Sequence, residues 1–67
     1  MRKTQRRILG AMLQLADNDM MVDETVTVIA GQAQIAMGGM ISDALELLEY
    51  HNKINRLEGA HRWQITV

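Results

Sequence analysis

Residues 38–67 read GGMISDALELLEYHNKINRLEGAHRWQITV, a helical pattern followed by a strand pattern. After the double glycine, apolar residues recur one helical turn apart, at Met40, Ile41, Ala44, Leu45 and Leu48. That spacing predicts a helix over about 40–51, because one face of a helix repeats every three to four residues. Two short runs on either side of Gly59 then predict a β-hairpin over about 54–67, since glycine suits a tight turn.

The predicted hairpin admits two strand registers, which depend on the length of its turn. A loop of two or four residues places Ile54 opposite Ile65 and Arg56 opposite Trp63. That register allows a cation–π contact between the guanidinium group and the indole ring. A loop of three residues instead pairs Leu57 with Trp63. The sequence leaves both registers open.

Two further helices are predicted upstream of this stretch. Thr4 is a candidate N-cap for a first helix over about 4–17, whose apolar residues have helical spacing: Ile8, Leu9, Met12, Leu13 and Ala16. The pair Asp23-Glu24 suits a helix N-terminus, so a second helix is predicted over about 24–35. The alternative is a short strand at 25–29 followed by a shorter helix, because every residue of that run is β-branched.

The length and composition limit the architecture and the cellular setting. The chain has 67 residues and contains neither cysteine nor proline. A chain of this length supports one small domain, predicted to span residues 1–67. The lack of cysteine excludes a disulfide framework, a thiolate metal site and a cysteine nucleophile. It also fits an intracellular protein, and we expect a cytoplasmic one.

Charge is strongly segregated along the chain, although the formal net charge is only −1. Residues 1–16 carry four basic residues and no acid, and residues 17–49 carry seven acids and no base. Residues 50–67 carry three basic residues and one acid. The net charge argues against a generally polycationic nucleic-acid binder. The segregation indicates that the basic ends and the acidic middle face different partners.

Several classes of function are disfavoured by spacing and polarity. The basic start is not followed by the apolar run of a signal peptide, and the uncharged stretch 25–42 is too polar to span a membrane. His51 and His61 lack the spacing of a zinc site, and no nucleophile–base arrangement is visible. We therefore expect no membrane association, no metal, no cofactor and no enzymatic activity.

The large apolar side chains each allow two interpretations. Trp63, the single tryptophan, is predicted to anchor the hairpin to the core, and the alternative is an exposed ring that stacks on a partner. The six methionines are predicted to fill the core of a chain without phenylalanine. The alternative for four of them is an adaptable interface, formed by Met20, Met21, Met37 and Met40.

The order helix, helix, short turn, helix and hairpin resembles that of the winged helix-turn-helix family. Arg6-Arg7-Ile8-Leu9 opens the first helix as in many small bacterial and archaeal regulators. Ile41–Glu49 resembles a recognition helix, and Asn52–Thr66 resembles the strand–wing–strand end of the family. The resemblance covers nearly the whole chain. It implies a mainly α fold with a small β-hairpin, a three-helix winged helix-turn-helix.

The resemblance also implies binding to double-stranded DNA, as a dimeric transcription regulator or accessory factor. Contacts from the third helix would then come from Gly38, Gly39, Met40, Ser42, Asp43 and Glu46. Contacts from the wing and its base would come from Arg56, His61, Arg62 and Lys53. A second contact with phosphates would come from the amino-terminal residues Arg2, Lys3, Arg6 and Arg7.

The predicted third helix departs from the family in its charge. Base-reading helices usually offer arginine, lysine, asparagine or glutamine. This helix offers no base, and its polar face carries Ser42, Asp43, Glu46, Glu49 and Tyr50. Carboxylates near a phosphate backbone are costly. The alternative hypothesis is therefore a protein-interaction module, in which Asp43, Glu46 and Glu49 bind a basic partner or another subunit.

Overall fold

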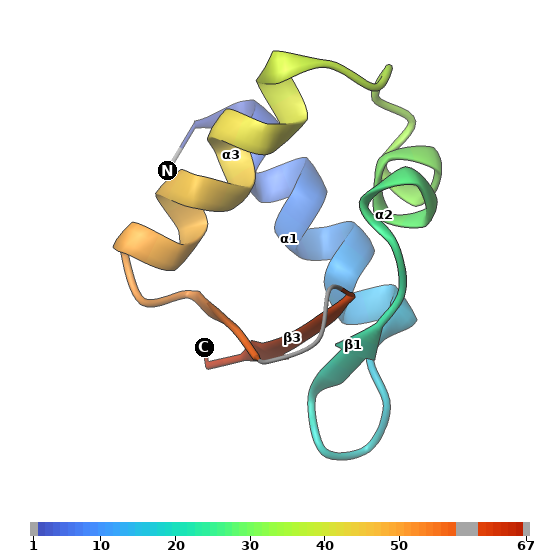
Figure 1. Cartoon of the computed structure of the whole chain (residues 1–67), viewed down its shortest axis with the longest axis vertical. Coiled ribbons are helices and arrows are strands. Elements are labelled where there is room, and N and C mark those ends of the chain that lie inside the picture. The colour runs from blue at the N-terminus through green and yellow to red at the C-terminus, as the bar shows by residue number, and fades with distance from the viewer. Residues whose placement is uncertain (1, 58–60, 67) are drawn as a thin grey trace.

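Three helices lie on one side of a small antiparallel sheet in the computed structural model, which describes residues 2–57 and 61–66 (Figure 1). In chain order the elements are α1 (Lys3–Leu15), β1 (Met21–Asp23), α2 (Val26–Ala33), α3 (Gly39–Tyr50), β2 (Ile54–Arg56) and β3 (Arg62–Ile65). The prediction of a mainly α fold with a small β-hairpin is confirmed. Among the described residues, no helix is long and apolar enough to cross a membrane.

The sheet has the order β1-β3-β2, so β3 is its central strand. Ile54 pairs with Ile65 and Arg56 pairs with Trp63, which confirms the first of the two predicted registers and rules out the second. The Arg56 guanidinium carbon lies 5.7 Å from the centroid of the Trp63 ring, so the predicted cation–π contact forms. The turn expected around Gly59 lies outside the described residues.

β1 is the one strand that the sequence pattern does not predict. It has three residues, too few to show a clear alternation, and its partner β3 lies about 40 positions further along the chain. The chain reaches β1 through a turn that the carboxylate of Asp17 closes. Its Oδ1 accepts hydrogen bonds from the backbone N–H groups of Asp19, at 2.9 Å, and Met21, at 3.0 Å. This turn explains why α1 ends at Leu15 and not at the predicted residue 17.

The N-terminal ends of the first two helices differ from the prediction. α1 begins at Lys3, with Arg2 as the N-cap residue and no side-chain cap, so Thr4 is inside the helix and the prediction of a Thr4 cap is wrong. α2 begins later than predicted because Thr25 caps it, its Oγ1 accepting a hydrogen bond from the N–H of Val28 at 3.3 Å. That cap starts a helix within the β-branched run, so the alternative of a strand at 25–29 is wrong.

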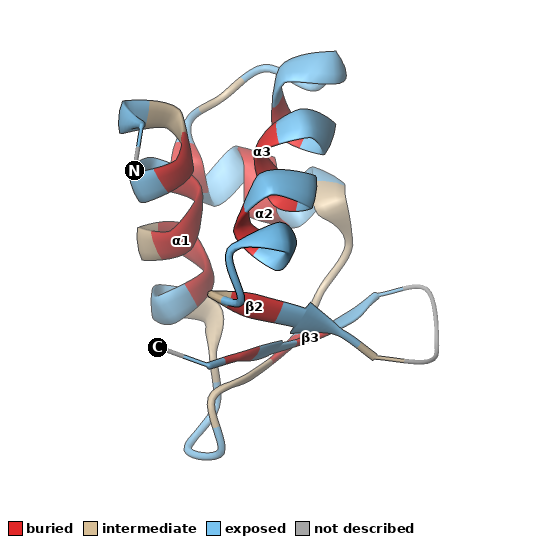
Figure 2. Cartoon of the chain, turned by 90° about the vertical axis from the view of Figure 1, so that its left-hand side faces the viewer, coloured by how far each residue is buried: buried red, intermediate tan, exposed pale blue. Residues whose placement is uncertain are grey.

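The core lies between the three helices and the inner face of the sheet (Figure 2). Trp63 is only 3% exposed, which confirms that it anchors the hairpin and contradicts the exposed alternative. The prediction that the methionines fill the core holds for only some of them. Met12 is fully buried, whereas Met37 and Met40 are exposed. Both lie at the turn before α3 and the start of that helix, where the chain runs over the surface.

α2 and α3 are each followed within two residues by a residue with left-handed backbone geometry, and neither of these residues is glycine. Gln34 has φ 58° and Asn52 has φ 59°. After α2, the N–H of Gln34 donates to the carbonyl of Gly31, and the N–H of Ile35 donates to that of Ala30 at 3.0 Å. This is the Schellman arrangement, in which glycine is usual because it adopts a positive φ without steric cost.

Arg7 of α1 completes the end of α2. Its guanidinium Nη2 donates to the carbonyl oxygens of Ala33, at 2.9 Å, and Gln34, at 3.1 Å. A cation at a helix C-terminus is favourable because the last carbonyls carry partial negative charge. The side chain thus joins α1 to the C-terminal end of α2.

Replacing Gln34 with glycine is expected to stabilise the protein. A left-handed backbone costs a non-glycine residue about 1–2 kcal/mol, part of which is offset by the greater unfolded-state freedom of glycine, so the expected gain is about 0.5–1 kcal/mol. Urea unfolding of Gln34→Gly and of the wild type measures it. Arg6→Gly is the control, because Arg6 is an exposed residue inside α1 and its substitution is expected to cost about 1 kcal/mol. A Gln34→Gly variant as destabilised as the control would contradict the assigned geometry.

Replacing Arg7 with methionine is expected to destabilise the protein by about 1–2 kcal/mol, because two charge-assisted hydrogen bonds to backbone carbonyls are lost. Arg6→Met is a matched control, since Arg6 is its exposed neighbour on the same helix and removes the same charge. The expected cost for Arg6→Met is within about 0.5 kcal/mol of zero. Equal unfolding midpoints for the two variants would argue against a capping role for Arg7.

Candidate functional site

α3 presents the side chains on which both functional hypotheses depend. Its inner side is buried through Ile41, Ala44, Leu45 and Leu48. Because a helix turns once in 3.6 residues, the residues between these positions project outward. Ser42, Asp43, Glu46 and Glu49 are all exposed, as the spacing predicts.

Large apolar side chains lie among these carboxylates, which the sequence pattern does not predict. Met40 was expected in the core stripe but is 63% exposed, and Leu47 is 39% exposed. Tyr50, predicted on the polar face, is 79% exposed. The exposure of Leu47 could have been predicted from the sequence, since Leu47 does not belong to the helical stripe that contains Ile41, Leu45 and Leu48. We call this surface the α3 face, made up of Met40, Asp43, Glu46, Leu47, Glu49 and Tyr50.

The hairpin meets the α3 face at Arg56. The backbone N–H of Arg56 donates to Oε2 of Glu49 at 3.1 Å, and the guanidinium group lies over Trp63. A hollow at this junction is lined by Ser42 and Glu46 from α3 together with Arg56 and Trp63 from the hairpin. Arg56 is therefore held close to carboxylates. Phosphate binding there would have to overcome the negative charge of α3.

The other predicted wing residues lie further along the hairpin. His61 and Arg62 are exposed at the start of β3. Arg62 is paired with Asp23 of β1, so an acid stands directly across the strand from it. Opposite charges at paired positions attract, which offsets part of the positive charge that Arg62 offers to a phosphate.

The basic amino-terminal residues divide between two places. Arg2 lines a groove with Met40, Asp43 and Leu47 of α3, beside the α3 face. Arg6 lines a different groove, between α1 and the end of α2, where Arg7 caps that helix. Neither groove is lined by a described residue of the hairpin. Lys3 is exposed at the first position of α1.

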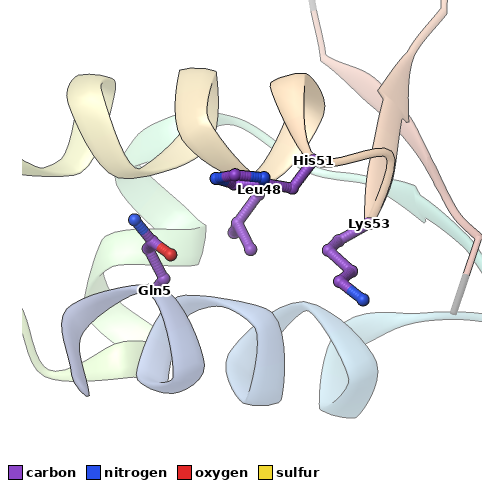
Figure 3. A pocket seen from close by; sticks show the side chains of 4 residues that line it. All are labelled: Gln5, Leu48, His51 and Lys53. Atoms are coloured by element: carbon purple, nitrogen blue, oxygen red, sulfur yellow. The ribbon is translucent and has the colours of Figure 1, made fainter. Parts of the chain in front are cut away.

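Lys53, predicted at the base of the wing, is half-buried and faces away from the hairpin arginines. It lines a pocket between α1 and the end of α3, together with Gln5, Leu48 and His51 (Figure 3). His51 is the C-cap residue of α3, the position expected for it, and its ring stands edge-on to Tyr50 with the centroids 5.3 Å apart. In residues 2–57 and 61–66, no three His, Asp or Glu side chains gather in the manner of metal ligands.

The α3 face combines negative charge with apolar area, and its central part is hollowed. Asp43, Glu46, Leu47, Glu49 and Tyr50 line this shallow depression together. Carboxylates attract cationic groups, while the leucine and tyrosine offer apolar surface that a partner can cover. Comparison of the chain with protein-family models, curated proteins and solved structures finds no match.

Proposed function

We propose that this chain is a winged-helix protein-interaction module whose α3 face binds a basic, amphipathic segment of a partner protein. The observation that carries the proposal is the composition of that face. Three carboxylates, from Asp43, Glu46 and Glu49, alternate with the exposed apolar side chains of Met40, Leu47 and Tyr50. A basic segment with its own apolar side matches both properties.

The element order supports the winged-helix part of the proposal. Three helices precede a hairpin, and β1 adds to the free edge of β3 to give the sheet order β1-β3-β2. This arrangement leaves the outer side of α3 uncovered by any other described element. In a DNA-binding winged helix that side would enter the major groove.

Electrostatics favour a protein partner over DNA at this surface. Every carboxylate on α3 would approach the phosphates, whose contacts normally supply most of the binding free energy. The exposed methionine, leucine and tyrosine also gain little from phosphates, whereas methionine and tyrosine are enriched at protein interfaces. The same side chains that oppose DNA binding therefore favour a basic protein segment.

A second copy of the chain is one source of such a segment. Arg2, Lys3 and Arg6 are exposed near the start of α1 and supply basic groups to a neighbouring α3 face. We accordingly propose that the module also self-associates. Charge complementarity between the ends of α1 and α3 supports that contact.

Binding of double-stranded DNA through the hairpin is the second candidate function, as a transcription regulator or accessory factor. The observation that favours it is the exposure of Arg56, His61 and Arg62 in the described parts of the hairpin. Arg2, Lys3 and Arg6 would supply further phosphate contacts, and Ser42 would approach the groove. Such binding would be mainly electrostatic, because phosphate contacts position a protein without reading sequence.

Reversing two charges of the α3 face is expected to abolish binding of a basic helix. The probe is a fluorescein-labelled amphipathic peptide of leucine and lysine, measured by fluorescence anisotropy. Asp43→Lys/Glu46→Lys is expected to weaken binding at least about tenfold, since like charges then face each other. Glu49 is left in place because its carboxylate accepts the N–H of Arg56.

The matched control is Asp19→Lys/Glu24→Lys, which changes the net charge equally at acids away from α3. This control is expected to bind the peptide like the wild type. Sedimentation of the same three proteins measures self-association, which the α3 substitutions are expected to remove. Equal peptide binding by both double variants would contradict the proposed role of the α3 face.

The DNA-binding candidate is tested by Arg56→Ala/Arg62→Ala. If the hairpin binds phosphates, the slope of log affinity against log salt concentration is expected to decrease in magnitude by about one for each contact removed. A labelled random-sequence duplex is the probe, measured from low to physiological salt. An unchanged affinity and slope would rule out this candidate. Salt-dependent wild-type binding that the double variant loses would favour it over the protein-interaction proposal.

A further inference from the structure

We propose that the pocket between the first turn of α1 and the end of α3 binds a small organic carboxylate. The pocket has a volume of about 280 Å³ and is lined by Gln5, Leu48, His51 and Lys53. Side chains reach into it from both sides, Gln5 from α1 and Leu48 from α3 (Figure 3). It shares no residue with the α3 face, so the inference goes beyond the proposed function and does not depend on it.

Gln5 is the residue that points to a ligand. It is the one polar residue among the described residues that is buried, with 6% of its surface exposed. Its side chain makes no hydrogen bond to another described residue. Among the described residues, every side-chain N or O atom that is fully enclosed has a hydrogen-bond partner, so the Gln5 amide is not fully enclosed. The amide therefore meets solvent, and Figure 3 shows its oxygen on the side that faces Leu48 and Lys53. A half-turn of the amide exchanges the oxygen and the NH₂ group, so that the side chain can donate to a molecule bound in the pocket. Gln5 is thus a buried polar side chain that has no described protein partner and is available to a ligand.

The charges around the pocket select an anion. Lys53 carries an ammonium group, which lies toward α1 in Figure 3, and His51 carries a ring N–H donor. Among the described residues, no carboxylate lines the pocket. Gln5 lies in the first turn of α1, where the helix dipole favours negative charge. Three carbonyls in the last turn of α3 point their partial negative charge at backbone donors and not at the ligand. Those of Leu47, Leu48 and Glu49 accept the N–H groups of His51, Lys53 and Asn52, respectively.

The backbone that carries Lys53 is held in place before any ligand arrives. The N–H of Lys53 donates to Leu48, and its carbonyl accepts the N–H of Thr66, both at 2.9 Å. The Thr66 hydroxyl donates to the carbonyl of Asn52 at 2.5 Å. The end of β3 thus fixes the backbone that carries Lys53. A preformed site loses less conformational freedom on binding.

The size of the pocket and the Leu48 side chain indicate the rest of the ligand. A cavity of this volume is at the lower end of the range for ligand sites, so it suits a molecule of a few carbon atoms. Leu48 offers an apolar wall between the polar groups. A carboxylate with a short aliphatic chain satisfies both the donors and this wall.

The test is a titration of the ¹⁵N-labelled full chain with sodium butyrate at constant ionic strength, followed by ¹H–¹⁵N correlation spectra. Saturable shifts are expected in the Gln5 side-chain NH₂ pair and the backbone amides of His51 and Lys53, with a dissociation constant on the order of a millimolar. Butyramide, which has the same shape without the charge, is expected to bind at least about tenfold more weakly. Equal shifts with butyramide would overturn the proposal.

Two variants distinguish butyrate binding in the pocket from butyrate binding elsewhere on the surface. Lys53→Met is expected to reduce butyrate affinity about tenfold, while Lys3→Met, which removes the only other lysine, leaves it unchanged. Gln5→Met keeps the length of the side chain and is expected to weaken binding without loss of spectral dispersion. Shifts that persist in Lys53→Met and Gln5→Met, or that do not saturate, would overturn the site. Inorganic phosphate binding as tightly as butyrate would overturn the assignment of a carboxylate.

Discussion

The pairing of β3 with two strands at once fixes how the helices and the binding surfaces are arranged. Trp63, in the middle of β3, lies opposite Val22 on one side and Arg56 on the other. Because the indole and Val22 are buried, a shift of one residue in either register would move apolar side chains from the core to the solvent. The strand thereby joins the chain segment before α2 to the segment after α3.

This register also determines which charges lie beside the α3 face. It sets Arg56 beside the last turn of α3, where its N–H reaches Glu49 and its guanidinium group covers Trp63. The end of β3 then continues to Thr66, which holds the backbone of Lys53 on the opposite side of the domain. Two cations that are only three positions apart in sequence therefore have different surroundings. Arg56 lies beside carboxylates of the α3 face, and Lys53 lies in a pocket that no described carboxylate lines.

The parts of the fold that local patterns determine could be predicted, and the parts that depend on distant contacts could not. α1, α3 and the hairpin follow from apolar spacing that is visible within one segment. β1 exists only because β3 offers an edge to pair with, and the capping role of Arg7 depends on where α2 ends. For the site, spacing placed the carboxylates of α3 on the surface. It did not predict the exposure of Met40, because apolar character alone does not determine which side of a helix start is covered.

The fold brings back together the charges that the sequence separates. Asp43 shares a groove with Arg2 at one end of α3, and Glu49 accepts the N–H of Arg56 at the other. Glu46, between these ends, lines a hollow together with Arg56. The negative charge of the α3 face is therefore partly offset beside Arg2 and along the side that meets the hairpin. The shallow depression at Leu47 and Tyr50 is lined by three carboxylates and by no described basic residue. Since attraction between charges falls with distance, the proposed partner segment would gain most by placing its basic groups over this depression. The net charge of −1 describes none of these local surfaces.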